Sequence, residues 1–199
     1  GDRRLMIISN IRENGEPVGL LPDGELMFHS DSVFLEKPLM GAMLYAEEIP
    51  STGGNTMFAN MYDAFESLPE TMQDRLSNLQ AVNVFDYETQ VRTGRFDRAK
   101  SPHATHPAVR THPETGRKAL YVNFGHTVRF QGMTEAESTP ILNYLFRHQV
   151  QPAFTCCFKW RRGSIAFWDN RAVLHNPVND YHGYKRVMHR IIIAGEKPH

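Results

Sequence analysis

The sequence predicts a mainly β protein with a few inserted helices, an α+β chain built on a double-stranded β-helix, or jelly-roll. Two observations lead to this prediction. Strand-length segments with alternating or continuous apolar residues recur along the chain between Gly, Pro, Asn and Asp residues. Helical patterns are fewer, and strands and helices do not alternate in the order that a parallel βαβ sheet requires.

The predicted strands are apolar or alternating segments that end at turn-forming residues. In chain order they cover residues 41–49, 79–87, 107–111, 118–122, 154–160, 165–168 and 184–194. The segments 107–111 and 118–122 flank the turn sequence Pro113-Glu114-Thr115-Gly116, which predicts a hairpin. Residues 51–55 (STGGN) are expected to form another turn.

Three helices are predicted from their start signals. Residues 60–68 and 69–78 form two short helices, the second with Pro69 in its first turn, where proline is tolerated. Thr134-Glu135-Ala136-Glu137 has the spacing of a capping box, in which a Thr and a Glu satisfy backbone N–H groups reciprocally. The helix that it starts is expected to run to His148.

Composition excludes two classes of partner. The 199 residues include 22 Lys and Arg against 22 Asp and Glu, so the formal net charge is zero. Such a balance argues against nucleic acid or an anionic membrane surface as the main partner. No apolar run approaches the roughly 18 residues of a membrane span, and the first residues do not resemble a signal peptide. The two cysteines, Cys156 and Cys157, are adjacent and unsuited to pairing, so we expect a reduced, cytoplasmic protein.

The domain organisation is expected to be simple. Residues 1–199 predict one domain, and the start in an apolar run without an initiator Met suggests that an N-terminal segment is missing. Residues 88–103 form a polar stretch rich in Arg and Lys, which predicts a mobile lid or loop.

The first chemical signal is the tetrapeptide Phe28-His29-Ser30-Asp31. On a strand, His29 and Asp31 would project from the same face and could supply two ligands of a 2-His-1-carboxylate site for non-haem Fe(II). A surface His–Asp hydrogen bond is the alternative. The third ligand would be one of nine other histidines: His103, His106, His112, His126, His148, His175, His182, His189 or His199. His175 stands out because it follows an apolar strand and a polar turn, and precedes a strand that carries two arginines.

Those two arginines, Arg186 and Arg190, lie on one face of the predicted strand 184–194 among large apolar residues. Burying a guanidinium is costly unless it meets an anion. Because four residues of strand span roughly 13 Å, the two are expected to bind separate anionic groups or the two ends of one dianion. A structural pairing with Asp or Glu is the alternative.

Taken together, the motifs resemble the Fe(II)/2-oxoglutarate-dependent taurine dioxygenase family, the TauD/TfdA group, over nearly the whole chain. The matching segments are 28–31, 53–56 (GGNT), 106–113, 119–123, 168–171 (WDNR), His175 and 186–190. The resemblance implies the jelly-roll of clavaminate synthase-like 2-oxoglutarate dioxygenases. It also implies a mobile lid over the substrate at residues 88–103 and a homo-oligomeric assembly.

The same resemblance implies roles for individual residues. His29, Asp31 and His175 are similar to the family's iron ligands. Thr56 and Arg186 match the residues that hold 2-oxoglutarate, and Arg190 matches a second arginine near that cosubstrate or the substrate's anionic group. Residues near the substrate are then Glu25, Ser32, His126 and Arg190.

The implied activity is hydroxylation of a small anionic organic substrate (a sulfonate, sulfate ester, aryloxy acid or carboxylic acid) with Fe(II), 2-oxoglutarate and O2, releasing succinate and CO2. Three positions differ from the taurine enzymes and make taurine itself doubtful: Glu25, Phe28 and His126 stand where those enzymes have Asn, Trp and an aromatic residue. Two other hypotheses are a cupin-like metal protein with non-redox activity and a jelly-roll binding module.

Overall fold

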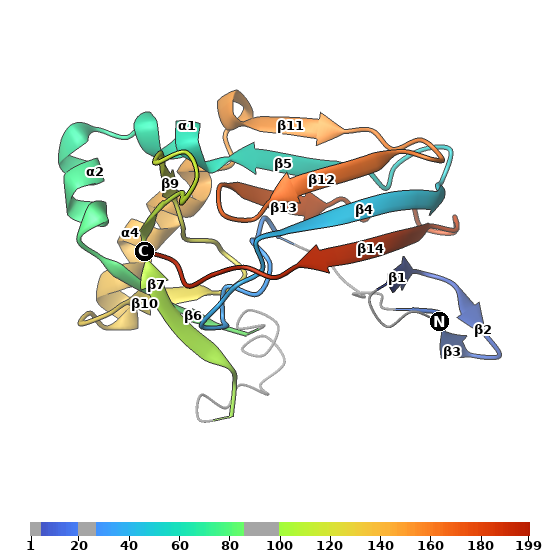
Figure 1. Cartoon of the computed structure of the whole chain (residues 1–199), viewed down its shortest axis with the longest axis horizontal. Coiled ribbons are helices and arrows are strands. Elements are labelled where there is room, and N and C mark those ends of the chain that lie inside the picture. Colours follow the sequence, from blue (N-terminus) through green and yellow to red (C-terminus); the bar gives the residue numbers. More distant parts are fainter. Residues whose placement is uncertain (1–4, 20–26, 86–99) are drawn as a thin grey trace.

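The computed structural model describes residues 5–19, 27–85 and 100–199, and two facing antiparallel sheets form its centre (Figure 1). The larger sheet has four strands in the order β1 (Met6–Ser9), β14 (Val187–Ile193), β4 (Gly41–Glu48) and β12 (Ile165–Asp169). The smaller has the order β11 (Thr155–Phe158), β5 (Thr56–Asn60) and β13 (Val173–Pro177). Aromatic side chains pack between the sheets, with the rings of Phe58 and Trp168 5.6 Å apart. The predicted jelly-roll is confirmed.

Most of the remaining elements lie at one end of this sandwich (Figure 1). They are a three-stranded sheet in the order β10 (Thr127–Phe130), β6 (Gln80–Val84) and β7 (His103–Pro107), and the hairpin of β8 (Val109–Thr111) and β9 (Lys118–Leu120). The helices are α1 (Met61–Glu66), α2 (Glu70–Ser77), α4 (Glu135–His148) and the 3-10 turn η1 (Pro152–Phe154). A small hairpin, β2 (Arg12–Glu13) and β3 (Glu16–Pro17), follows β1 and lies at the other end of the sandwich (Figure 1). No helix in these described ranges has the length and apolar composition needed to cross a bilayer.

Locally encoded elements agree with the sequence. The Thr134 capping box is present in both directions, and α4 ends at His148 as predicted. The predicted hairpin corresponds to β8 and β9, which pair antiparallel. The prediction for 154–160 was partly wrong, since its first residue belongs to η1, where Pro152 opens a 3-10 turn before β11 begins.

Strands stabilised by distant partners were harder to predict. β5, β7, β10 and β13 were not predicted, and their short sequences acquire strand structure by pairing with remote segments. His103 begins β7, so the predicted loop 88–103 ends too late, while its residues 88–99 lie outside the described ranges. The strand predicted at 184–194 begins only at Val187, where a register shift between Val187 and Met188 separates Arg186 from the regular ladder.

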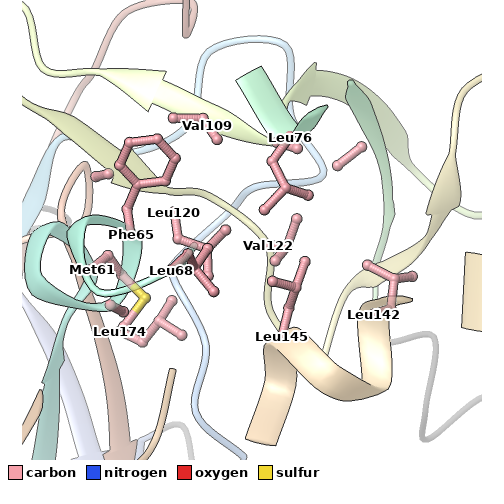
Figure 2. Packing of buried hydrophobic residues seen from close by; sticks show 14 of the residues in the cluster. Met61, Phe65, Leu68, Leu76, Val109, Leu120, Val122, Leu142, Leu145 and Leu174 are labelled. Atoms are coloured by element: carbon pink, nitrogen blue, oxygen red, sulfur yellow. The ribbon is translucent and has the colours of Figure 1, made fainter. Parts of the chain in front are cut away.

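The two larger hydrophobic clusters hold these parts together. The sandwich core contains Leu44, Trp160, Trp168 and Met188, all buried. The larger cluster lies where the helices meet the β8–β9 hairpin, and Figure 2 shows Leu142 and Leu145 of α4 beside Val122. Replacing one such buried leucine by alanine lowers the free energy of unfolding by about 2–5 kcal/mol. Packing in this cluster therefore holds the helical end against the sandwich.

A buried arginine anchors the segment that follows β14. Arg110 of β8 is 1% exposed, and its guanidinium donates to the carboxylate of Glu196 and lies 5.2 Å from the centre of the Tyr121 ring. The backbone N–H of Thr111 also donates to the carbonyl of His199, at 2.9 Å. The pair therefore ties residues beyond β14 to the helical end of the molecule.

We expect Glu196→Gln to lower the free energy of unfolding by about 2 kcal/mol, because a buried guanidinium loses its charged partner. Urea unfolding at neutral pH measures the change. The matched control is Glu66→Gln: Glu66 pairs with Arg117 at 2.8 Å where both side chains are about half exposed, so that variant should change stability by less than about 1 kcal/mol. Equal effects of the two variants would contradict the anchoring role.

A buried histidine predicts acid sensitivity. His106 of β7 is 1% exposed and its Nε2 lies 2.9 Å from the carbonyl oxygen of Leu35. Burial, the largest cause, lowers the pKa of His106 below its ordinary value. The unfolded chain therefore binds a proton that the folded chain does not, between the folded pKa and about 6.5. The free energy of unfolding is therefore highest above this pH window and falls as the pH drops through it.

One such histidine changes the free energy of unfolding by at most about 1.4 kcal/mol per pH unit. We therefore expect His106→Asn to reduce the loss of unfolding free energy between pH 7 and pH 5.5 by about 1 kcal/mol. His103→Asn, the same change at an exposed position of the same strand, is the control for the substitution itself. Unfolding curves at several pH values test this, and parallel pH profiles for the wild type and His106→Asn would refute it.

Candidate metal centre

Two histidines distant in sequence are neighbours through their backbones. His29 forms an isolated antiparallel bridge with His175 of β13: each backbone N–H donates to the other residue's carbonyl, at 3.0 and 2.9 Å. The two imidazole rings then lie 4.3 Å apart, centre to centre. A bridge of this kind fixes both side chains on one face, so the structure brings His175, one of the nine candidates, next to His29.

Asp31 completes the group. Its Oδ1 lies 3.9 Å from Nε2 of His29 and 3.9 Å from Nε2 of His175. The ligand atoms of the three residues all lie within 4.8 Å of one another, and this is the one cluster of three or more potential metal ligands in the described ranges. The expectation that His29 and Asp31 share a strand was wrong, because Asp31 already lies in a turn and Ser32 has a positive φ of 58°.

The protonation states suit metal ligation. His29 Nδ1 lies 2.7 Å from the carbonyl oxygen of Met27, so Nδ1 donates to that oxygen and Nε2 is the ring nitrogen left for a metal. Burial lowers the pKa of His175 to about 3, which keeps its imidazole neutral. Burial alone would raise the pKa of Asp31, but the Arg190 guanidinium, which donates to Oδ2, holds this pKa well below its usual range. Two imidazoles and one carboxylate are the donor set of non-haem Fe(II), so these residues fit that ion.

A glycine turn leads to Thr56 at the start of β5. Gly53 and Gly54 have φ of 76° and 67°, and a Cβ on Gly53 would lie 2.6 Å from Asp180 Oδ1. The same Asp180 oxygen accepts the Gly54 N–H at 2.7 Å. Trp160 Nε1 donates to Thr56 Oγ1 at 3.0 Å. Since an indole N–H can only donate, the Thr56 hydroxyl hydrogen remains available for a ligand oxygen.

Arg186 lies beside this turn. It is 5% exposed, its Nε donates to the Gly54 carbonyl at 3.2 Å, and its guanidinium lies 5.7 Å from the centre of the Tyr181 ring. Within the described part of the chain it forms no ion pair with a carboxylate, and burial lowers its pKa. A buried cation without an acidic partner is a candidate anion-binding group.

Arg190 is placed differently from Arg186. Its guanidinium donates to Asp31 Oδ2, so the anion nearest to it is the candidate metal ligand itself. The two arginines thus contact different groups, Asp31 in the case of Arg190 and the Gly54 carbonyl in the case of Arg186.

The predicted substrate residues are only partly described. His126 lies beside His29, with ring centres 6.3 Å apart, and its Nδ1 lies 3.2 Å from the carbonyl oxygen of Val84. Burial lowers the pKa of His126 to about 4, so its ring is uncharged near neutral pH. Ser32 directly follows Asp31 in the turn. Glu25 lies outside the described residues.

Sequence reasoning missed several residues that shape the site. Trp160 and Asp180 were not predicted, because their partners Thr56 and Gly54 are remote in sequence. Asn170 was not predicted as a site residue either, although its Nδ2 lies 3.2 Å from Asp31 Oδ2. The motif WDNR was the only signal that could have drawn attention to it.

The fold and site together define a jelly-roll protein with a candidate 2-His-1-carboxylate metal centre and a buried arginine that is a candidate anion-binding group. The sequence model of the family described as "Taurine catabolism dioxygenase TauD, TfdA family" matches residues 1–192, and the chain belongs to this family. The resemblance inferred from the motifs is confirmed.

Individual relatives agree with this assignment. The chain is 35% identical over 181 residues to an alkylsulfatase of Acinetobacter baylyi, covering 85% of this chain and 56% of the relative. It is 32% identical to the (S)-phenoxypropionate/alpha-ketoglutarate-dioxygenase of Sphingobium herbicidovorans, covering 96% and 73%. A crystal structure of a putative alpha-ketoglutarate-dependent taurine dioxygenase from Burkholderia xenovorans matches with a TM-score of 0.83 and 30% identity, over 100% of this chain and 67% of that one. The chain thus spans little more than half the length of the alkylsulfatase.

Proposed function

We propose that this chain carries the iron and 2-oxoglutarate sites of an oxygenase that hydroxylates a small anionic organic compound. The observation that carries the proposal is the position of Asp31 Oδ1, 3.9 Å from Nε2 of both His29 and His175. The buried Arg186 supports it, because 2-oxoglutarate offers the carboxylate that this guanidinium lacks among the described residues.

His29, Asp31 and His175 would hold the ion, and Arg186 with the Thr56 hydroxyl would bind the distal carboxylate of 2-oxoglutarate. Bound Fe(II) would supply the activation of O2, with one oxygen atom entering succinate as CO2 leaves and the other entering a substrate C–H bond. Burial of His175 and Asp31 keeps water from the ligands, and the hydrogen bond from Trp160 orients the Thr56 hydroxyl as a donor.

An aromatic wall beside His29 supports a substrate with an alkyl or aryl body. The Phe34 ring lies 4.7 Å from that of Phe85 and 5.4 Å from that of His126, which is uncharged. Such a wall suits the apolar alkyl or aryl body of a sulfate ester or an aryloxy acid. Phe34→Ala should therefore raise KM more for a long alkyl sulfate than for a short one, since each buried CH2 contributes about 0.8 kcal/mol.

The test is an anaerobic titration of 2-oxoglutarate into the Fe(II)-loaded protein, followed by a screen for succinate release with alkyl sulfates, aryloxyacetates and taurine. A visible charge-transfer band and O2-dependent succinate formation would support the proposal. Iron binding without a band would favour the cupin-like, non-redox alternative. Failure to bind iron would leave a jelly-roll binding module.

We also infer that the protein acts in the reduced cytoplasm on a dissolved small molecule. The family resemblance implies that it assembles as a homo-oligomer. Cys156 and Cys157 are both free and exposed on β11, the outer strand of the smaller sheet. Exposed thiols of this kind persist in a reducing compartment. Thiol titration of protein isolated without reductant tests the compartment, and light scattering coupled to gel filtration tests the assembly.

A further inference from the structure

The two carboxylate oxygens of Asp31 have different surroundings. Oδ1 faces Nε2 of His29 and of His175, at 3.9 Å from each. Oδ2 instead accepts two hydrogen bonds, one from Nδ2 of Asn170 at 3.2 Å and one from the Arg190 guanidinium. Asp31 is 8% exposed, so these donors stand in for water at Oδ2.

Asn170 is held at each of its polar groups. Its Oδ1 accepts the indole N–H of Trp168 at 3.0 Å, its backbone N–H donates to the Met40 carbonyl at 2.8 Å, and its carbonyl accepts the Ser30 hydroxyl at 2.8 Å. Because an indole nitrogen can only donate, Trp168 fixes the orientation of the amide. Nδ2, and not Oδ1, therefore faces Asp31.

The position of Asn170 in the chain matters as much as its bonds. It lies in the turn between β12 and β13, and β13 carries His175. Through Ser30 and Asp31 the same residue contacts the segment that carries the other two ligands. One side chain thus ties the carboxylate ligand to the strand that delivers the second histidine.

A metal ligand carboxylate can bind through one oxygen or through both. If Oδ2 turned toward a metal, it would give up two hydrogen bonds, one of them charge-assisted, at a cost of about 1.5–3 kcal/mol for the charged bond alone. Binding through both oxygens would also occupy a position that a facial triad leaves open to other ligands.

We propose that Asn170 is a positioning residue that commits Asp31 to bind a metal through Oδ1 alone. The inference rests on the proposed metal centre, but not on the reaction with 2-oxoglutarate. Arg190 supplies charge to Oδ2, whereas Asn170 supplies a donor whose direction is fixed by the Trp168 indole.

The test uses Mn(II) as the probe, without 2-oxoglutarate, on the full chain. Free-ion EPR gives the Mn(II) dissociation constant, and line broadening in 17O-water gives the number of water molecules on the bound ion. We expect Asn170→Ala to weaken Mn(II) binding about 10- to 100-fold and to remove one bound water. Trp168→Phe keeps a ring beside His175 and should cause a smaller change in the same direction.

The control is Gln149→Ala, which removes another buried amide, 1% exposed and located just after α4. It should leave both Mn(II) readouts unchanged. An Asn170→Ala protein that matches the wild type in affinity and water count would overturn the proposal, as would weaker binding with the same water count. If Asn170→Ala does not fold, Trp168→Phe is the test: weaker Mn(II) binding with fewer bound waters supports the proposal, and an unchanged water count overturns it.

These outcomes are separable from the proposed function. A wild type that binds Mn(II) but shows no 2-oxoglutarate band with Fe(II) would refute the oxygenase and leave the role of Asn170 standing. A wild type that binds neither ion would overturn both.

Discussion

Replacing His175 with alanine should abolish iron binding and all 2-oxoglutarate-dependent succinate formation. The variant removes one of three protein ligands, and the bridge to His29 then carries only one imidazole. Removing a residue that only orients a metal ligand already weakens metal binding about 10- to 100-fold. Removing the ligand itself should therefore weaken metal binding by more than about 100-fold. Asp31→Ala should have the same effect on metal binding, and it also leaves Arg190 without its carboxylate.

Metal content after anaerobic dialysis and succinate yield measure this result. The control is His148→Ala, because His148 is also buried, at 9% exposed, and its Nε2 lies 2.8 Å from the Ala64 carbonyl oxygen in the helical cluster. That variant should unfold more easily yet bind iron normally. A His175→Ala protein that keeps both iron and turnover would refute the assignment of the centre.

Arg186→Met should weaken 2-oxoglutarate binding strongly while leaving the unliganded protein at least as stable. Removing one partner of a buried charge pair costs about 2–5 kcal/mol, which corresponds to a roughly 30-fold to several-thousand-fold rise in Kd. Without the cosubstrate, however, Arg186 is a buried cation that forms no ion pair among the described residues, so an apolar side chain removes a desolvation cost.

Titration of the iron–2-oxoglutarate band gives the Kd, and thermal unfolding of the metal-free protein gives the stability. Arg162→Met removes an arginine whose side chain is 79% exposed and pairs with Glu47, so it should change neither quantity appreciably. If Arg186→Met instead binds 2-oxoglutarate normally and loses stability, Arg186 is a structural residue and not the anion-binding group.

The parts of the fold that the sequence predicts well depend on neighbours along the chain. The helix at Glu135–His148 follows from a capping box whose members are three residues apart. The hairpin of β8 and β9 follows from the turn between them. By contrast, β13 was not predicted, because its short sequence VLHNP becomes a strand only by pairing with β5 and with His29.

The candidate site divides in the same way. His29 and Asp31 were predicted from their spacing, and His175, Thr56 and Arg186 from motifs that resemble a known family. The chain by itself thus determined the residue types of the site and the class of chemistry that they suit.

Only the tertiary structure decided which groups meet. It pairs His29 with His175, turns Oδ1 of Asp31 toward both histidines and places Asn170 on Oδ2. It also assigns Arg190 to Asp31 and leaves Arg186 beside Gly54. The physical reason is that turns, caps and periodicity arise from contacts within a few residues, whereas the direction of a buried side chain is set by packing and hydrogen bonds between strands that are remote in sequence.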